Sequence, residues 1–278
     1  MEYSEKKQAL KDYLQQLAKQ DLVVAFSGGV DSSLLLRMCC EAAQEAGTTV
    51  YAITVQTELH PQGEVEIAQR VAQEAGAKHL VIRLDEFNEA DIRMNPVDRC
   101  YRCKRCLFAK LQVKAQQLGA SQVVEGTNED DMHVYRPGIK ALKELGICSP
   151  LAKFGLTKAE VRKLADEYGI SVANRASTPC MATRFPYGTE LSKELMRQVS
   201  EVEEWMRQIG FYNVRLRVHG NIARLEIDQQ EMTALIDKKD EIVERIKQMG
   251  IDYVTLDLEG FRSGSMDIKI ERDYHAHG

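Results

Sequence analysis

The sequence predicts an α/β protein: a Rossmann-like, doubly wound parallel sheet followed by a smaller α+β domain. Short apolar runs alternate with helical patterns, as expected for buried parallel strands with helices on both faces. The runs lie at 22–26, 49–55, 79–84 and 122–124. A glycine pair, Gly28-Gly29, joins the first run to a helical pattern. We expect the first domain to span residues 1–180 and the second to span residues 181–278.

Composition excludes several classes of protein. The chain has 278 residues, enough for one large or two modest domains. Its net charge of −5 argues against a general nucleic-acid-binding surface. No apolar run is as long as a membrane span, and the polar start does not resemble a signal peptide. We therefore expect a cytoplasmic protein without nucleic-acid or membrane partners, whose seven cysteines are thiols, metal ligands or nucleophiles.

The stretch from Ala25 to Ser33, AFSGGVDSS, has the features of a phosphate-binding loop. Its glycines let the backbone approach a phosphate, and the N–H groups at a helix start bind anions. The serines add hydroxyl donors, and Asp31 is suited to hold a magnesium ion. Walker A and the dinucleotide fingerprint are both absent, and the plain alternative is a capped strand-to-helix turn. The predicted ATP-binding residues of this loop are Ala25, Phe26, Ser27, Gly29, Val30, Asp31, Ser32 and Ser33.

The segment SGGVDSS at 27–33 resembles the pyrophosphate loop of the N-type ATP pyrophosphatases, the PP-loop superfamily. Members split ATP into AMP and pyrophosphate and adenylate an oxygen of their substrate. The resemblance implies ATP lying over the ends of the strands. It also implies ATP contacts from Thr54, Gly126 and Thr127, which lie near the ends of two other apolar runs. Arg136 is a further candidate to meet a phosphate or an acidic substrate.

Three cysteines recur at three-residue intervals in a basic segment: Cys100, Cys103 and Cys106. On a helix, Cys100 and Cys103 share a face, whereas Cys106 is rotated by roughly 120° from Cys100. Two thiolates are an incomplete site for zinc or a cluster, so unligated thiols on a basic helix are the plain alternative. Cys180 lies in a shaped loop between two prolines and is a candidate nucleophile.

The last third predicts a separate α-β-β-α-β arrangement, which favours an antiparallel sheet. The expected elements are a helix at 192–209, strands at 214–218 and 222–227, a helix at 230–249 and a strand at 253–258. Arg215 and Arg217 would share one strand face, where paired guanidinium groups suit phosphate or carboxylate. A solvated face is the plain alternative. We expect the tail, 273–278, to be disordered.

Nearly the whole chain resembles the LarE family of ATP-dependent sulfur transferases, which act in synthesis of the nickel-pincer nucleotide cofactor. Beyond the PP loop, the resemblance rests on YRPGIKA at 135–141, TRFPYGT at 183–189, VHGNIARLE at 218–226 and YVTLDLEGFRSG at 253–264. It implies that ATP and magnesium are used to adenylate a carboxylate of pyridinium-3,5-dicarboxylate mononucleotide, which becomes a thiocarboxylate. It also implies a trimer-based hexamer that works with small molecules and with other cofactor-assembly proteins.

The same resemblance assigns roles to residues. Cys180 aligns with the sulfur donor, which single-cysteine members sacrifice to leave dehydroalanine. Cys100 and Cys103 instead indicate a three-cysteine branch in which these two residues and Cys180 hold a 4Fe-4S cluster with one open iron. The sequence leaves both mechanisms open. The implied catalytic residues are Cys180, Asp31, Lys104, Glu203 and Arg184, and the implied substrate- and phosphate-binding residues are Thr183, Arg184, Arg215, Arg217 and Arg136.

Two other functions compete with this interpretation. A tRNA thiolase or deazapurine nitrile synthase shares the ATP fold, and the spacing from Cys100 to Cys106 mimics its zinc site. Bound zinc in place of iron would favour that function. A non-enzymatic carrier with a relic nucleotide fold is the second, although the intact Ser27, Asp31 and Ser32 argue against it. Measurable pyrophosphate release would exclude it.

Overall fold

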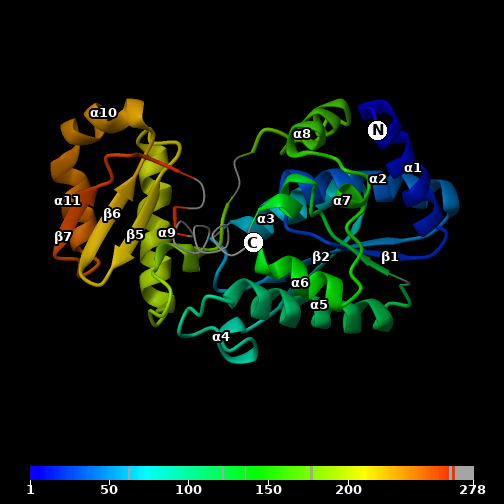
Figure 1. Cartoon of the computed structure of the whole chain (residues 1–278), viewed down its shortest axis with the longest axis horizontal. Helices are drawn as coiled ribbons and strands as arrows, with labels where there is room; N and C mark the ends of the chain where they lie inside the picture. Colours follow the sequence, from blue (N-terminus) through cyan, green and yellow to red (C-terminus); the bar gives the residue numbers. More distant parts are fainter. Residues whose placement is uncertain (62, 121, 135, 176–177, 263–264, 267–278) are drawn as a thin grey trace. The chain divides into compact units, whose positions relative to one another are not determined.

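The computed structural model describes two compact units (Figure 1). The described residues are 1–61, 63–120, 122–134, 136–175, 178–262 and 265–266. The first unit comprises Met1–Thr57, Gln62–Ile92 and Asp98–Thr178, and the second comprises Glu58–Pro61, Arg93–Val97 and Pro179–Gly278. The predicted domain boundary after residue 180 stays a prediction. The predicted disordered tail, 273–278, lies outside the described residues.

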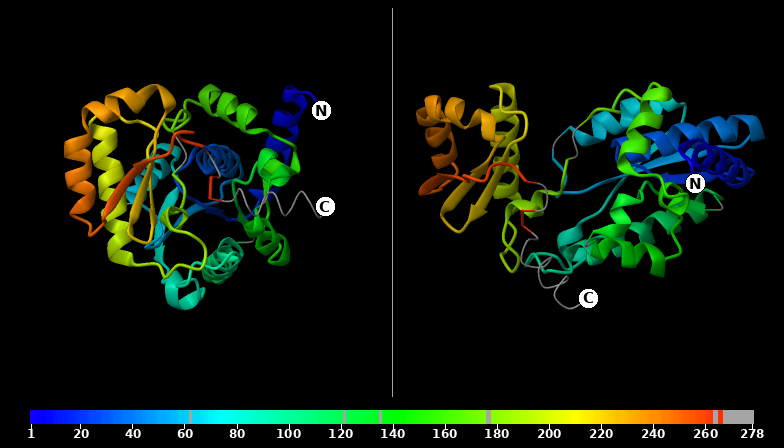
Figure 2. Two further views of the ribbon diagram at one scale, coloured as in Figure 1. Left: turned by 60° about the vertical axis from the view of Figure 1, so that its left-hand side comes forward. Right: turned by 45° about the horizontal axis from the view of Figure 1, so that its top comes forward.

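The first unit is built on a four-stranded parallel sheet with strand order β3-β2-β1-β4. Its elements are α1 (Tyr3–Leu17), β1 (Leu22–Ala25), α2 (Val30–Ala46), β2 (Val50–Gln56), α3 (Glu64–Ala75), β3 (Lys78–Arg83), α4 (Glu86–Glu89), α5 (Arg99–Gln117), β4 (Gln122–Val124), η1 (Asp130–His133), α6 (Pro137–Glu144), α7 (Pro150–Lys153) and α8 (Lys158–Glu167). Helices lie on both faces of the sheet (Figures 1 and 2). The predicted Rossmann-like class is confirmed.

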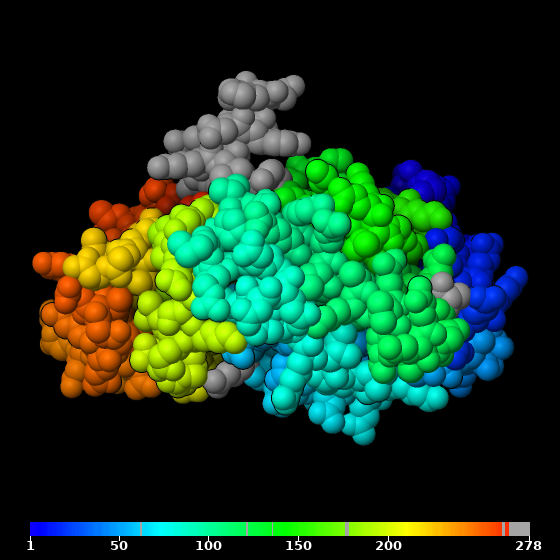
Figure 3. All heavy atoms as spheres, turned by 90° about the horizontal axis from the view of Figure 1, so that it is seen from below, coloured from blue at the N-terminus to red at the C-terminus, as the bar shows by residue number. Residues whose placement is uncertain are grey.

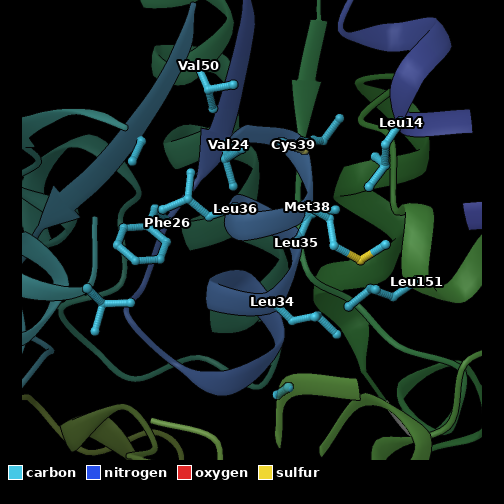
Figure 4. Close-up of a cluster of buried hydrophobic side chains, with 14 of the residues drawn as sticks. Leu14, Val24, Phe26, Leu34, Leu35, Leu36, Met38, Cys39, Val50 and Leu151 are labelled. Carbon is cyan, nitrogen blue, oxygen red and sulfur yellow. The ribbon is translucent and has the colours of Figure 1, made fainter. Parts of the chain in front are cut away.

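Each sheet face packs its own core because successive side chains of a strand point to opposite faces. Val24 of β1 belongs to one core, shared with α1, α2, α3 and α8 (Figure 4). Val23, its neighbour, belongs to the other core, shared with α5 and α6. Both side chains are fully buried. The continuous apolar run of β1 therefore reflects burial on both faces.

The strand order places a switch point at β1. The chain passes from β1 to β2 and β3 on one side, then returns to β4 on the other side of β1. In open α/β sheets, ligands bind at the carboxyl ends of the strands beside such a reversal. The loops that follow β1 and β4 are therefore the expected binding loops of this unit.

The second unit holds a three-stranded sheet of order β5-β6-β7. Its elements are η2 (Met181–Arg184), α9 (Lys193–Gln208), β5 (Arg215–His219), β6 (Ile222–Glu226), η3 (Gln229–Glu231), α10 (Met232–Asp237), α11 (Lys239–Lys247) and β7 (Tyr253–Leu256). The prediction of an antiparallel sheet was wrong for one pair. β5 and β6 are antiparallel, but β6 and β7 are parallel, because the intervening helices return the chain to the starting end of β6.

The helix predicted at 230–249 is divided into two helices at Lys238. Asp240 and Glu241 then fall in the first turn of α11, where carboxylates interact favourably with the helix dipole.

In the first unit, α5 lies at the surface of the face shown in Figure 3. No helix among the described residues is both long and apolar enough to cross a membrane.

Removing side-chain volume from the first core should cost much of the stability of the first unit. Leu35 of α2 is fully buried there (Figure 4). We expect Leu35→Ala to lower the free energy of unfolding by about 2–5 kcal/mol. Urea unfolding followed by far-UV circular dichroism measures this. Val113→Ala on α5, where the residue is 54% exposed, is the control and should change stability by less than about 0.5 kcal/mol. Equal effects would contradict the packing described here.

Candidate active site

The loop between β1 and α2 is a closed turn held by its own serines. The Ser27 and Ser32 hydroxyl oxygens lie 3.1 Å apart, and the Gly29 N–H donates to Ser27 Oγ at 3.3 Å. Ser32 Oγ donates to the Gly29 carbonyl oxygen at 3.1 Å. The buried Ser33 hydroxyl has no hydrogen-bond partner among the described residues. The loop thus offers hydroxyl and amide donors at the start of a helix, as an anion site requires.

Glycine is needed at two positions around this turn. Gly28 has a φ of +73°, and a Cβ placed on it would lie 3.1 Å from Ala68 Cα. A Cβ on Gly126, in the loop after β4, would lie 2.9 Å from the Ser32 nitrogen. The turn therefore packs closely on α3 at Gly28, and the loop after β4 packs closely on the start of α2 at Gly126.

Asp31, in the first turn of α2, has two partners that bring distant segments together. Asn128 Nδ2 donates to Asp31 Oδ1 at 3.0 Å, and the Lys158 ammonium pairs with Asp31 Oδ2. Asn128 follows β4, and Lys158 begins α8. Neither residue was among the predicted site residues. The sequence signals were the position of Asn128 beside Gly126-Thr127 and the capping box that places Lys158 at a helix start.

Thr54 lies near the end of β2, where the sequence placed an ATP contact. Its side chain is buried, and its Oγ1 lies 2.8 Å from His79 Nε2 on β3. Burial lowers the pKa of His79, so this ring is neutral at physiological pH. The His79 ring also meets Phe26 edge to face, with 6.3 Å between ring centroids. Thr54 and Phe26 thus both contact the His79 ring.

Gly126 and Thr127 are held by the buried Glu125. The Thr127 N–H and Oγ1 donate to Glu125 Oε2 at 3.1 and 2.8 Å. Ser149 Oγ donates to the other carboxylate oxygen. Because both carboxylate oxygens are bonded, the loop after β4 has a fixed course. Glu125 and Ser149 support the site without having been predicted as parts of it.

Arg136 and Lys104 lie in the first unit but contact different groups. Arg136 pairs with Asp131 at 2.8 Å, and its side chain is 53% exposed. The stem of Lys104 packs on Gly138, where an added Cβ would lie 2.6 Å from Lys104 Cδ. The Arg136 guanidinium is therefore not locked in a buried ion pair.

Three cysteines lie on α5, and the first of them, Cys100, is the second residue of the helix and is exposed. Arg99 Nη2 lies 3.8 Å from Cys100 Sγ. Cys103 is half-buried, and burial, followed by the charge of Glu89, raises the pKa of Cys106. Cys180 belongs to the second unit and immediately precedes η2. Within the described residues, no group of three or more His, Cys, Asp or Glu side chains is arranged to hold a metal ion.

Arg184 and Glu203 form a fully buried ion pair in the second unit. Arg184 Nε and Nη2 donate to the two Glu203 oxygens at 2.9 and 2.8 Å, and the Leu216 N–H donates to Oε1 at 2.9 Å. Burial alone would raise the pKa of Glu203, but the Arg184 charge and these hydrogen bonds hold it below its usual value. Arg184 Nη1 donates to the Pro179 and Cys180 carbonyl oxygens. The pair thus anchors the backbone around Cys180.

The two predicted arginines of β5 have different surroundings. Arg217 donates to both oxygens of the buried Glu226, at 2.6 and 2.9 Å, and to the Thr183 carbonyl oxygen at 2.6 Å. Arg215 forms no ion pair with any described carboxylate; it donates to the Val214 carbonyl oxygen and lies over the Phe261 ring. Burial and the nearby Arg184 lower the pKa of Arg215 to about 10. Arg215 is thus buried without an ion pair to a described carboxylate, and the Glu203 charge only partly offsets the lowering of its pKa.

The parallel sheet, the serine-glycine turn and the acidic residue at the helix start define a PP-loop nucleotide-binding protein. The PP-loop domain family matches residues 2–133. The pyridinium-3,5-bisthiocarboxylic acid mononucleotide synthase of Lactiplantibacillus plantarum is 36% identical over 259 residues, 93% of this chain and 91% of that protein. The chain belongs to the family of this synthase, the LarE family of PP-loop enzymes.

Two other relatives place the chain within the superfamily. An uncharacterized Synechocystis protein is 36% identical over 247 residues, 88% of this chain and 91% of that protein. A tRNA-specific 2-thiouridylase of Rickettsia bellii is 27% identical over 250 residues, 75% of this chain and 65% of that protein. The similarity to the thiouridylase is lower and covers less of both chains.

Replacing Gly28 should separate the effect of backbone strain from that of close packing. Gly28 and Gly47 have φ values of +73° and +74°, but a Cβ on Gly47 would meet nothing within 4 Å. Gly28→Ala and Gly47→Ala should therefore share a strain of about 1–2 kcal/mol. We expect only Gly28→Ala to weaken ATP binding, by about tenfold or more, as measured by titration calorimetry. Comparable ATP affinity in the two variants would refute the proposed need for a bare backbone at Gly28.

Removing the Glu203 charge should destabilise the second unit. We expect Glu203→Gln to cost about 3–5 kcal/mol, because Arg184 would remain buried without its anion. Denaturation followed by the fluorescence of Trp205, the one tryptophan of the sequence, reports on the same helix. Glu204→Gln is the control: Glu204 is 61% exposed and pairs with Arg207, so its loss should cost less than about 1 kcal/mol.

The Glu203 contribution should also depend on pH. Its pKa is lowered in the folded protein, so its stabilisation is present above the ordinary carboxyl pKa and is lost as the pH falls through the lowered value. The stability difference between the parent chain and Glu203→Gln should therefore shrink in acid. A difference that stays constant down to acid unfolding would show that the carboxylate charge is not what stabilises this unit.

Proposed function

We propose that this chain is an ATP-dependent sulfur transferase that adenylates a carboxylate of pyridinium-3,5-dicarboxylate mononucleotide and converts it to a thiocarboxylate of the nickel-pincer cofactor. The observation that carries the proposal is the 36% identity across 93% of the chain to a pyridinium-3,5-bisthiocarboxylic acid mononucleotide synthase. The serine-glycine turn beside the β1 switch point supports it, because it can hold the triphosphate of ATP.

Activation of the carboxylate is the first step. A carboxylate is a poor acyl donor because oxide is a poor leaving group. Attack of a carboxylate oxygen on the α-phosphorus of ATP releases pyrophosphate and leaves an acyl adenylate, from which AMP departs readily. The N–H and hydroxyl groups of Ser27, Gly29 and Ser32, which now bond one another within the loop, would bind the departing pyrophosphate. Asp31 would hold magnesium, whose preferred ligands are oxygens such as this half-buried carboxylate. When bound there, the ion would neutralise phosphate charge.

The phosphate of the substrate needs a cation of its own. Arg215 fits this role, because it is 9% exposed, retains its charge at neutral pH and has no ion-pair partner among the described residues. Arg184 and Arg217 are already paired with Glu203 and Glu226. We therefore assign the direct phosphate contact to Arg215, and we assign to Arg184 and Arg217 the task of fixing the Thr183 and Cys180 backbone.

Sulfur delivery would use Cys100, Cys103 and Cys180. Cys100 and Cys103 on α5 and Cys180 before η2 would supply three thiolates, the number that a 4Fe-4S cluster with one open iron requires. When bound, such a cluster supplies an exchangeable sulfide for transfer. The alternative is sacrifice of Cys180. Its thiolate would displace AMP to form a thioester, and loss of the Cα proton with cleavage of the Cβ–S bond would leave dehydroalanine and the thiocarboxylate.

A tRNA thiolase is the less favoured function. The thiouridylase relative is 27% identical and covers 75% of this chain, against 36% and 93% for the synthase. The net charge of −5 also gives no general surface for RNA. We further propose a trimer-based hexamer, which sedimentation of the purified protein would test.

Turnover of the dicarboxylate nucleotide tests the function and the sulfur source together. Protein purified without oxygen is assayed for iron, zinc and acid-labile sulfide, then incubated with magnesium, ATP and the nucleotide. Pyrophosphate release that depends on the nucleotide is expected. About four irons and an unchanged protein mass would support the cluster. A mass loss of one hydrogen sulfide without iron would make Cys180 the sacrificed donor. Absence of nucleotide-dependent pyrophosphate release would refute the function.

Cysteine variants provide the matched comparison. Cys100→Ala and Cys103→Ala should lose iron and sulfur transfer while still releasing pyrophosphate, because ATP binds elsewhere in the first unit. Cys106→Ala is the control on the same helix, since its thiol is rotated away and its pKa is raised by burial. It should retain iron and activity. If Cys106→Ala loses iron as completely as Cys100→Ala, the assignment of the ligands is wrong.

A further inference from the structure

The magnesium site assigned above is already occupied by an internal cation. Lys158 places its ammonium on Asp31 Oδ2, and Asn128 donates to the other carboxylate oxygen. The Asp31 and Lys158 side chains are 22% and 35% exposed. A metal ion that binds Asp31 must therefore displace the ammonium. This inference rests on the proposed use of magnesium–ATP.

Three sets of contacts fix the backbone around Lys158, so the position of its ammonium on Asp31 rests on a well-held helix start. The Thr157 side chain and the Glu160 carboxylate form a capping box at the start of α8. Lys6 of α1 pairs with Glu160 at 2.9 Å and donates to the Gly155 carbonyl oxygen at 2.7 Å. The Lys158 N–H donates to Asp130 at 2.8 Å. The four-carbon stem is the part free to change direction.

We propose that Lys158 is a placeholder for magnesium in the nucleotide-free protein and moves to the phosphates when magnesium–ATP binds. Magnesium would take the Asp31 carboxylate, and the released ammonium would pair with the triphosphate that arrives with the ion. Lysine suits this exchange because its ammonium is a compact charge on a flexible stem. The exchange leaves neither the carboxylate nor the ammonium without an opposite charge, which a half-buried site favours.

Binding of Mn²⁺ alone, measured by electron paramagnetic resonance, tests the placeholder without any turnover. We expect Lys158→Met to raise the Mn²⁺ affinity about tenfold, because the competing cation is gone. Lys158→Arg should lower it, since a guanidinium holds a carboxylate through two hydrogen bonds. Lys163→Met is the control. Lys163 lies on the same helix, but its ammonium lies 4.2 Å from the Tyr3 ring centroid and carries the same charge. It should bind Mn²⁺ like the parent chain.

ATP binding and pyrophosphate release test the second half of the exchange. In Lys158→Met, the rate of pyrophosphate release should fall by about 10²–10³, the usual cost of losing one charge-stabilising group. Its Mn²⁺ affinity should rise at the same time. Opposite changes in metal affinity and rate are the signature, because simple damage to the fold would lower both.

The outcomes separate this inference from the proposed function. Unchanged or weaker Mn²⁺ binding by Lys158→Met overturns the placeholder role, whatever the activity. Full pyrophosphate release by this variant overturns the movement to the phosphates. If the parent chain releases no pyrophosphate with the dicarboxylate nucleotide, the proposed function fails, whereas higher Mn²⁺ affinity in Lys158→Met would still support the placeholder.

Discussion

The carboxyl ends of β1 and β4 depend on a close contact between two backbone segments. The loop after β4 touches the start of α2 at Gly126, where a Cβ would lie 2.9 Å from the Ser32 nitrogen. This approach sets how far Asn128, two residues on, lies from Asp31. It also follows from the strand order, because β1 and β4 are neighbours and their carboxyl ends lie together. A side chain at Gly126 would push the loop away from α2, and would thus move Asn128, which donates, away from Asp31, which accepts.

The two units use charge in different ways. The Asp31–Lys158 pair is partly exposed, so its members can exchange partners at modest cost. Arg184–Glu203 and Arg217–Glu226 are buried, and breaking either would leave a charge without compensation. The buried pairs are therefore scaffolding for the segment around Cys180. Among the arginines predicted to bind substrate in this unit, Arg215 differs from Arg184 and Arg217 in forming no ion pair with a described carboxylate.

Local patterns predicted what local chemistry determines. The apolar runs and the Gly28-Gly29 turn were visible in the sequence and occur in the structure. The partners of charged groups were not visible in the sequence: Asp31 and Lys158 are 127 residues apart, and they meet because α8 packs in the same core as α2. The parallel pairing of β7 was missed for the same reason. An α-β-β-α-β pattern does not state on which side of a sheet the last strand joins.

The Asp31–Lys158 pair and the serine bonds of the turn also bear on which ligand this site would accept. Free magnesium must displace the Lys158 ammonium and leave it without its anion, and free ATP would bring its phosphates close to the Asp31 carboxylate. Free magnesium or free ATP, bound without the other, would thus create an uncompensated charge in a half-buried site. On our proposal, magnesium–ATP would supply both the cation for Asp31 and the anion for Lys158. The hydroxyl pair of Ser27 and Ser32 can turn from each other to the phosphates in the same event. The arrangement therefore favours the metal–nucleotide complex over either of its parts.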